Sequence, residues 1–111
     1  MADELRDRVV LVTGSSRGIG AEVAVRAAAE GATVAVHYRT DAAAARAIVE
    51  RVRATGSEGD CFDADVADGD DAVRLVERVI ERFGRIDGLV NNAGLTRSAR
   101  SSTSIRPSGT P

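Results

Sequence analysis

The 111-residue sequence contains no lysine and no tryptophan, and its aromatic side chains are two phenylalanines and one tyrosine. All of its basic side chains apart from one histidine are therefore arginines, and a hydrophobic core must be built from Ala, Val, Ile and Leu. A chain of this length buries about two thirds of its extended surface on folding. The composition thus predicts one small domain packed with short side chains.

A single cysteine, Cys61, excludes an internal disulfide and fits a reducing compartment. The formal net charge of -2 gives no general attraction to nucleic acid or to anionic lipid. No apolar run approaches the roughly 20 residues of a membrane span, and the charged first residues lack the apolar stretch of a secretory signal. We expect a cytoplasmic protein with no nucleic-acid partner, no membrane contact and no metal site.

Strand-like and helix-like segments alternate along residues 8–94. Short runs rich in Val and Ala are typical of strands covered on both faces, and a glycine follows each helical pattern. Strands alternating with helices of this length predict parallel strands, right-handed crossovers and a doubly wound α/β sheet. The predicted β-α-β-α-β-α-β order places strands at 8–13, 32–38, 59–66 and 86–91, and helices from the first glycine loop to Gly31, from Asp41 to Gly56 and over about 70–83.

The periodicity of apolar residues also predicts the buried face of each helix. The first helix has Ile19, Val23 and Ala27 at intervals of four residues, with Ala24 and Ala28 beside them. The third has Val73, Val76 and Ile80 on one face, with Leu75 and Val79 adjoining, and the second has Ile48, Val49 and Val52.

The segment V-T-G-S-S-R-G-I-G, residues 12–20, joins the first strand to the first helix. A phosphate binds to the free N–H groups at a helix N-terminus, where the helix dipole is positive. Close approach of the backbone requires small residues. Gly14 allows a sharp turn out of the strand, and Gly18 and Gly20 let the helix start close to both ligand and sheet.

The side chains of this loop add polar groups. Ser15 and Ser16 offer hydroxyls to phosphate oxygens, and Arg17 offers positive charge. A glycine-rich turn that binds nothing remains the alternative, because short motifs have false positives. A triphosphate-binding P-loop is disfavoured, since no G-K-[ST] follows.

Three motifs together resemble the short-chain dehydrogenase/reductase family. They are T-G-x-x-x-G-I-G, Asp65-Val66 and Asn91-Asn92-Ala93-Gly94, in the family's order and at suitable distances. The stretches SSRGIG and NNAGLTR look most like β-ketoacyl carrier-protein reductases. The resemblance implies the N-terminal half of a Rossmann fold, truncated, and a family chemistry of hydride transfer between a nicotinamide and a carbonyl or alcohol, with 3-oxoacyl-carrier-protein reduction as one candidate.

The resemblance also implies roles for single residues. The loop Gly14–Gly20, including Ile19, would hold the pyrophosphate and the adenosine ribose. Asp65 would accept a hydrogen bond from the adenine amino group, and the Val66 N–H would donate one to the ring. Asn91, Ala93 and Gly94 would line the floor under the ribose and the nicotinamide. Without the resemblance, Asp65 also reads as a helix cap or a solvated acid, and the asparagines as a turn.

The end of the second strand bears on the choice of cofactor. NAD-binding sites usually place an acid there to bond the ribose 2′-hydroxyl, but this segment reads V-A-V-H-Y-R-T. Arg17 and Arg39 could flank a 2′-phosphate as charged donors, which favours NADP(H) over NAD(H). The alternative is that both arginines are solvated surface charges. His37 is interpreted as a strand-end residue rather than a catalyst.

Catalysis in the family uses a Tyr-x-x-x-Lys pair that lies beyond the NNAG motif. This chain has no lysine, and its one tyrosine, Tyr38, lies in the cofactor half. We therefore assign no catalytic residue and expect little or no activity from this chain alone. Two alternatives remain open, a non-catalytic NADP(H)-binding module and a gene fragment without function.

Residues 97–111 differ from the rest in composition. They contain three arginines, both prolines and no acid, so we divide the chain into a half-domain at 1–96 and a tail at 97–111 that is expected to be disordered. One hypothesis is that the tail is the out-of-frame product of a frameshift. The strand at 86–91 would then be an apolar sheet edge, and the family's homo-oligomer interface would be largely missing.

Overall fold

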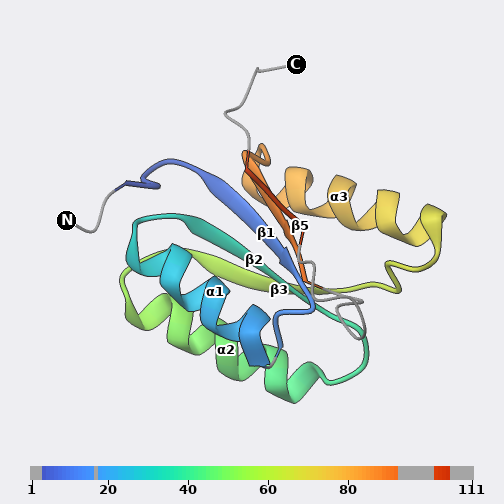
Figure 1. Cartoon of the computed structure of the whole chain (residues 1–111), viewed down its shortest axis with the longest axis horizontal. Coiled ribbons are helices and arrows are strands. Elements are labelled where there is room, and N and C mark those ends of the chain that lie inside the picture. Colours follow the sequence, from blue (N-terminus) through green and yellow to red (C-terminus); the bar gives the residue numbers. More distant parts are fainter. Residues whose placement is uncertain (1–3, 17, 93–101, 106–111) are drawn as a thin grey trace.

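The computed structural model describes residues 4–16 and 18–92, and the backbone of 102–105. These residues form a twisted sheet with helices on both faces (Figure 1). The strand order is β3-β2-β1-β4-β5, and the first four of these are parallel. The strands are β1 (Val9–Thr13), β2 (Thr33–Tyr38), β3 (Gly59–Asp63), β4 (Gly88–Asn91) and β5 (Ser102–Ile105).

The three helices lie on the two faces of this sheet. Helices α1 (Gly18–Ala29) and α2 (Ala42–Ala54) cover one face, and α3 (Gly69–Phe83) covers the other (Figure 1). After β3 the chain crosses back over the sheet and adds β4 on the other side of β1. The strands β1 and β4 are therefore neighbours in the sheet but not in the sequence. The predicted class is confirmed: this is the N-terminal β-α-β-α-β-α-β half of a Rossmann-like doubly wound sheet.

The central strand β1 contributes to both layers of the core. Val10 and Val12 pack towards α1 and α2, while Val9 and Leu11 pack towards α3. All four side chains are at most 5% exposed. A strand covered on both faces reads as a continuous apolar run, which is why the period-two signal of a half-exposed strand is absent here.

The predicted helix ends are also found. The carboxylate of Asp41 accepts a hydrogen bond from the Ala44 N–H at 3.0 Å and caps α2. Gly84 ends α3 in the left-handed conformation, with φ of 92°.

The predicted inner faces of α1 and α3 were partly wrong. Ile19 is 68% exposed, and α1 instead buries the alanines beside it in the pattern, including Ala24 and Ala28. In α3 the adjoining residues Leu75 and Val79 are buried, whereas Val73 is 57% exposed. Both helices carry two neighbouring apolar stripes, and periodicity alone does not say which stripe meets the sheet. The stripe predicted for α2 is confirmed.

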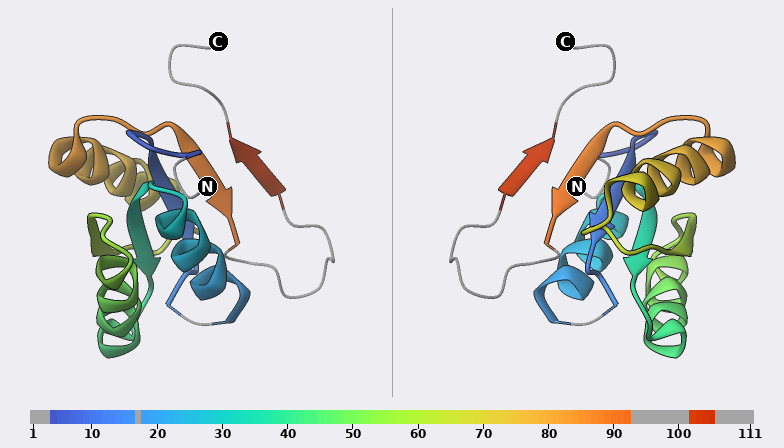
Figure 2. Two further views of the ribbon diagram at one scale, coloured as in Figure 1. Left: turned by 90° about the vertical axis from the view of Figure 1, so that its left-hand side faces the viewer. Right: turned by 90° about the vertical axis from the view of Figure 1, so that its right-hand side faces the viewer.

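The segment predicted to be disordered contains β5. This strand pairs antiparallel with β4, with Val90 opposite Thr103 (Figure 2). Because the backbone N–H and C=O groups of β4 pair with this strand, β4 is not a free edge of the sheet. Residues 97–101 and 106–111 lie outside the described residues. Within the described part of the chain, no helix is long and apolar enough to cross a membrane.

Candidate functional site

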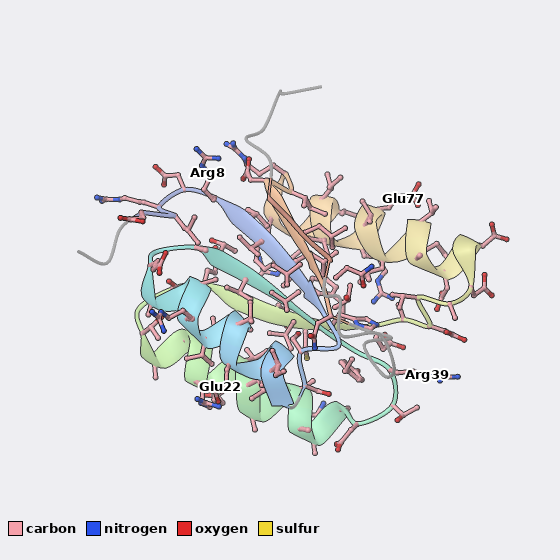
Figure 3. The ribbon with its side chains drawn as sticks, viewed as in Figure 1. Arg8, Glu22, Arg39 and Glu77 are labelled. Carbon is pink, nitrogen blue, oxygen red and sulfur yellow. The ribbon has the colours of Figure 1, made fainter. Side chains whose placement is uncertain are left out.

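A cleft of about 720 Å³ opens where the parallel strands end. It is bordered by the glycine loop after β1, by the segments that follow β2 and β3, and by one side of α3. Figure 3 shows Arg39 at this carboxyl edge and Arg8 at the opposite edge of the sheet. In open α/β sheets, ligands bind outside the carboxyl ends of the strands, next to the point where the strand order reverses. The cleft is therefore the candidate site.

The glycine loop has the backbone that its sequence predicts. Gly14 and Gly18 adopt φ of 63° and 64°, a left-handed region that strongly favours glycine. Gly20 is buried, and a Cβ placed on it would lie 2.7 Å from Nδ2 of Asn92 and 2.9 Å from Cα of Ser15, and closer still to the Gly14 carbonyl oxygen. The first turn of α1 is thus packed directly on the loop.

Ser15 has a role that differs from the predicted one. Its side chain is fully buried, and its hydroxyl donates to the Val12 carbonyl at 2.7 Å and accepts from the His37 N–H at 3.0 Å. The Ser15 N–H donates to the His37 carbonyl at 3.0 Å. The hydroxyl is therefore not presented to a phosphate, because it fastens the loop to β2. Ser16 does line the cleft.

Replacing the two serines separately should distinguish these roles. We expect Ser15→Ala to lower the free energy of unfolding by about 1–2 kcal/mol, because it leaves the buried His37 N–H without an acceptor. Ser16→Ala should change it by less than about 0.5 kcal/mol. Chemical unfolding of both variants without any added ligand tests this, and equal effects would contradict the assignment of Ser15.

The end of β4 is tied to the same loop by two asparagines. The Asn92 side-chain amide donates to the Gly14 carbonyl at 3.3 Å, and its backbone N–H donates to the Thr13 hydroxyl at 2.9 Å. That hydroxyl donates to Oδ1 of Asn91 at 3.1 Å. Asn92 thus joins the ends of the neighbouring strands β1 and β4. Asn91 lines the cleft.

An acidic turn after β3 forms the far wall of the cleft. One carboxylate oxygen of Asp65 accepts from the Ala67 N–H at 3.1 Å, while the Asp65 N–H donates to the Asp71 carboxylate at 2.6 Å. The hydrogen bond from the Asp65 N–H, and to a smaller extent the one from Arg74, hold the pKa of the Asp71 carboxyl below its usual value. Asp65 is not the helix cap; Asp68 caps α3. The turn keeps Asp65 and Val66 at the cleft.

Arg39 lies across the cleft mouth from this turn. Its guanidinium is 3.7 Å from the second carboxylate oxygen of Asp65, and its side chain is 73% exposed. An exposed pair of this kind is worth about 0–1 kcal/mol. Breaking the pair to bind a ligand therefore costs little free energy. Arg39 could then bind an anion, and Asp65 could accept a hydrogen bond from a donor beside it.

The predicted site residues fall into four groups. The cleft is lined by Gly14, Ser16, Arg39, Asp65, Val66 and Asn91. Gly18 and Ile19 line a separate apolar hollow beside α1, whereas Ser15 and Gly20 are buried. Arg17, Ala93 and Gly94 lie outside the described residues.

Three residues that the sequence analysis did not predict as cofactor-binding residues also shape the cleft. Thr13, His37 and Asn92 each lie at the end of a strand and hydrogen-bond across to a neighbouring segment. A polar side chain at the end of an apolar run is the signal that could have identified them.

Residues 8–106 match the family model described as short chain dehydrogenase. The chain belongs to the short-chain dehydrogenase family. Among curated proteins, the 3-oxoacyl-[acyl-carrier-protein] reductase of Staphylococcus epidermidis is 44% identical over 91 residues, which are 82% of this chain and 37% of the relative. The reductase of the same name from Staphylococcus aureus is 46% identical over 87 residues, 78% of this chain and 35% of the relative.

Solved structures of the family have the same architecture. A short chain dehydrogenase from Burkholderia cenocepacia, determined in complex with NADP, is 46% identical with a TM-score of 0.81, over 86% of this chain and 39% of the other. A dehydrogenase/reductase from Sinorhizobium meliloti is 39% identical with a TM-score of 0.79, over 81% of this chain and 36% of the other. The chain thus spans between about a third and two fifths of the length of these short-chain dehydrogenases.

Proposed function

We propose that the cleft binds NADP(H), with NAD(H) as the weaker ligand, and that the chain supplies the cofactor-binding half of a reductase acting on a carbonyl such as a 3-oxoacyl thioester. The bound cofactor supplies the hydride. Support comes from the relatives called 3-oxoacyl-[acyl-carrier-protein] reductase and from the Burkholderia short chain dehydrogenase in complex with NADP. A cytoplasmic location remains a prediction.

The observation that carries the proposal is the charge at the end of β2. NAD sites usually have a carboxylate there that accepts a hydrogen bond from the ribose 2′-hydroxyl. Here His37 takes that position, is 2% exposed and uses both ring nitrogens within the protein. The next side chain at the rim is the exposed Arg39. No carboxylate takes the place of His37, and the exposed pair of Arg39 with Asp65 is weak, so this guanidinium favours a 2′-phosphate over a hydroxyl.

Different residues of this chain would bind different parts of the cofactor. The N–H groups of the first turn of α1 and the Ser16 hydroxyl would hold the pyrophosphate. Asp65 would exchange its pairing with Arg39 for the adenine amino group, which frees Arg39 for the 2′-phosphate. Asn91, Ala93 and Gly94 would lie under the ribose and nicotinamide, with Arg17 near the phosphates and Ile19 beside the helix start.

Arg39→Ala tests the cofactor preference. We expect it to weaken NADPH binding by about tenfold, the worth of one charge-assisted hydrogen bond, and to leave NADH binding within about twofold. Arg46→Ala is the matched control, because Arg46 is also an exposed arginine and does not line the cleft. Fluorescence titration of the unmodified chain and both variants measures the dissociation constants. Equal affinities of the unmodified chain for NADH and NADPH would contradict the proposal.

A second candidate is cofactor binding without turnover. It is favoured by the absence of lysine from the 111 residues and by the position of the one tyrosine, Tyr38, which ends β2 and packs against the core. The two candidates separate in an assay that follows NADPH oxidation with a 3-oxoacyl thioester. Stabilisation by NADPH in a thermal shift, with no oxidation, supports binding alone.

A further inference from the structure

His37 joins two parts of the cleft that are not neighbours in the sheet. Its ring Nδ1 accepts a hydrogen bond from the Gly14 N–H at 2.8 Å, and its Nε2 lies 2.8 Å from the Ala64 carbonyl oxygen. Gly14 opens the loop after β1, whereas Ala64 directly precedes Asp65 after β3. Because β2 lies between β1 and β3, the imidazole spans the carboxyl edge from one side of β2 to the other.

The two contacts specify one form of the ring. A backbone N–H can only donate, so Nδ1 must carry a lone pair. A carbonyl oxygen can only accept, so Nε2 must carry the proton. The neutral Nε2–H tautomer satisfies both contacts. In the other tautomer the Nδ1–H would face the Gly14 N–H, and the Nε2 lone pair would face the Ala64 carbonyl oxygen. The main chain of His37 is fixed as well, since it exchanges two hydrogen bonds with Ser15.

We propose that His37 is a positioning residue for the cofactor site, which acts by holding the Gly14 peptide in the orientation that the phosphate-binding loop requires. The role rests on the proposed function. It goes beyond that function because His37, which is 2% exposed and uses both ring nitrogens within the protein, would act through the Gly14 peptide and not by binding the cofactor itself. Its Nδ1 is the acceptor that fixes the Gly14 N–H inward, and its Nε2–H keeps the Asp65 turn at a constant distance from the loop.

The ring form is tested without any cofactor. His37 is the only histidine in the chain, so the imidazole nitrogen spectrum of the ¹⁵N-labelled chain needs no assignment between histidines. In mildly alkaline buffer we expect the pattern of a protonated Nε2 and an unprotonated Nδ1, as the two contacts require. A protonated Nδ1, or rapid averaging between the two tautomers, would overturn the proposal.

Two substitutions separate the two contacts. In His37→Asn the amide oxygen falls near the place of Nδ1 and keeps the acceptor for Gly14. In His37→Gln the amide nitrogen falls near Nε2 and keeps the donor for Ala64, but the Gly14 N–H loses its acceptor. We expect the Asn variant to bind NADPH within about threefold of the unmodified chain, and the Gln variant to bind about tenfold more weakly.

Both variants lose the ring, so a merely structural role predicts equal losses of affinity. Equal affinities, or tighter binding by the Gln variant, would therefore overturn the proposal. The Gly14 amide proton shift gives a readout that needs no cofactor: it should remain far downfield in the Asn variant and move upfield in the Gln variant. If NADPH binds to none of the three proteins, the proposed function fails, whereas the tautomer and the Gly14 shift still decide the role of His37.

Discussion

Gly20→Ala is expected to lower the melting temperature by more than about 10 °C and to remove measurable NADPH binding. The new Cβ would lie 2.9 Å from Cα of Ser15, 2.7 Å from the Asn92 amide nitrogen and nearer still to the Gly14 carbonyl oxygen. Two of these three atoms belong to backbone that cannot rotate away. The helix must move off the loop, which costs about 3 kcal/mol or more of folding free energy. At this chain length each kcal/mol lowers the melting temperature by about 4 °C.

Two other glycines provide matched controls for that variant. Gly69 lies in the first turn of α3 with an open space around it, and Gly69→Ala should leave both melting temperature and NADPH affinity unchanged or slightly improved. Gly18→Ala meets no atom but must adopt φ of 64°, and should cost about 1 kcal/mol. Differential scanning fluorimetry with and without NADPH ranks the three. A Gly20→Ala chain that melts within about 2 °C of the unmodified one and binds NADPH would show that the packing of helix on loop does not form the site.

The glycine positions were predictable because their requirement is local. Gly14 needs a left-handed backbone, and Gly84 ends a helix in one; both demands can be read from the residue type and its place in the pattern. Asp41 was likewise predictable as a cap, since its carboxylate needs only the N–H groups of the following turn. The doubly wound parallel class was predictable as well, because strands that alternate with helices need crossovers and leave few alternatives.

The roles of Ser15 and His37 were not predictable in this way. Whether the Ser15 hydroxyl faces a ligand or a neighbouring strand depends on where β2 passes the loop, and that is set by the packing of the whole sheet. The same holds for the exposed Val73, because the choice between two adjacent apolar stripes is made by the position of α3 over the sheet. Sequence pattern identifies the polar or apolar residue, while tertiary packing determines its partner.

Asp87→Ala is expected to destabilise the fold by about 3 kcal/mol at neutral pH. Asp87 lies at the amino edge of the sheet, opposite the cleft, where its buried carboxylate accepts from the Val9 N–H at 2.9 Å and from the Arg85 guanidinium at 2.7 Å. The substitution leaves the Val9 N–H without its acceptor at the start of the central strand. Asp87→Asn keeps one acceptor but loses the charge, and should cost about 1–2 kcal/mol.

The same carboxylate predicts how stability depends on pH. Burial alone would raise the pKa of Asp87, but hydrogen bonds from Arg85 and Val9, with the charges of Arg85 and Arg8, outweigh it and hold the pKa below its usual value. A lowered folded-state pKa means that the stabilisation is complete above the unfolded value of about 3.9 and is lost as pH falls through the folded value.

Urea unfolding between pH 7 and pH 2 measures this dependence in the unmodified chain and in Asp87→Asn. The two stabilities should differ most above about pH 5 and converge towards about pH 2, because protonation removes the charge that the variant already lacks. Glu77→Gln, an exposed change on α3 (Figure 3), should follow the unmodified chain at every pH. A constant difference between Asp87→Asn and the unmodified chain down to pH 2 would mean that packing around residue 87, and not its charge bound to Arg85 and Val9, anchors the amino edge of β1.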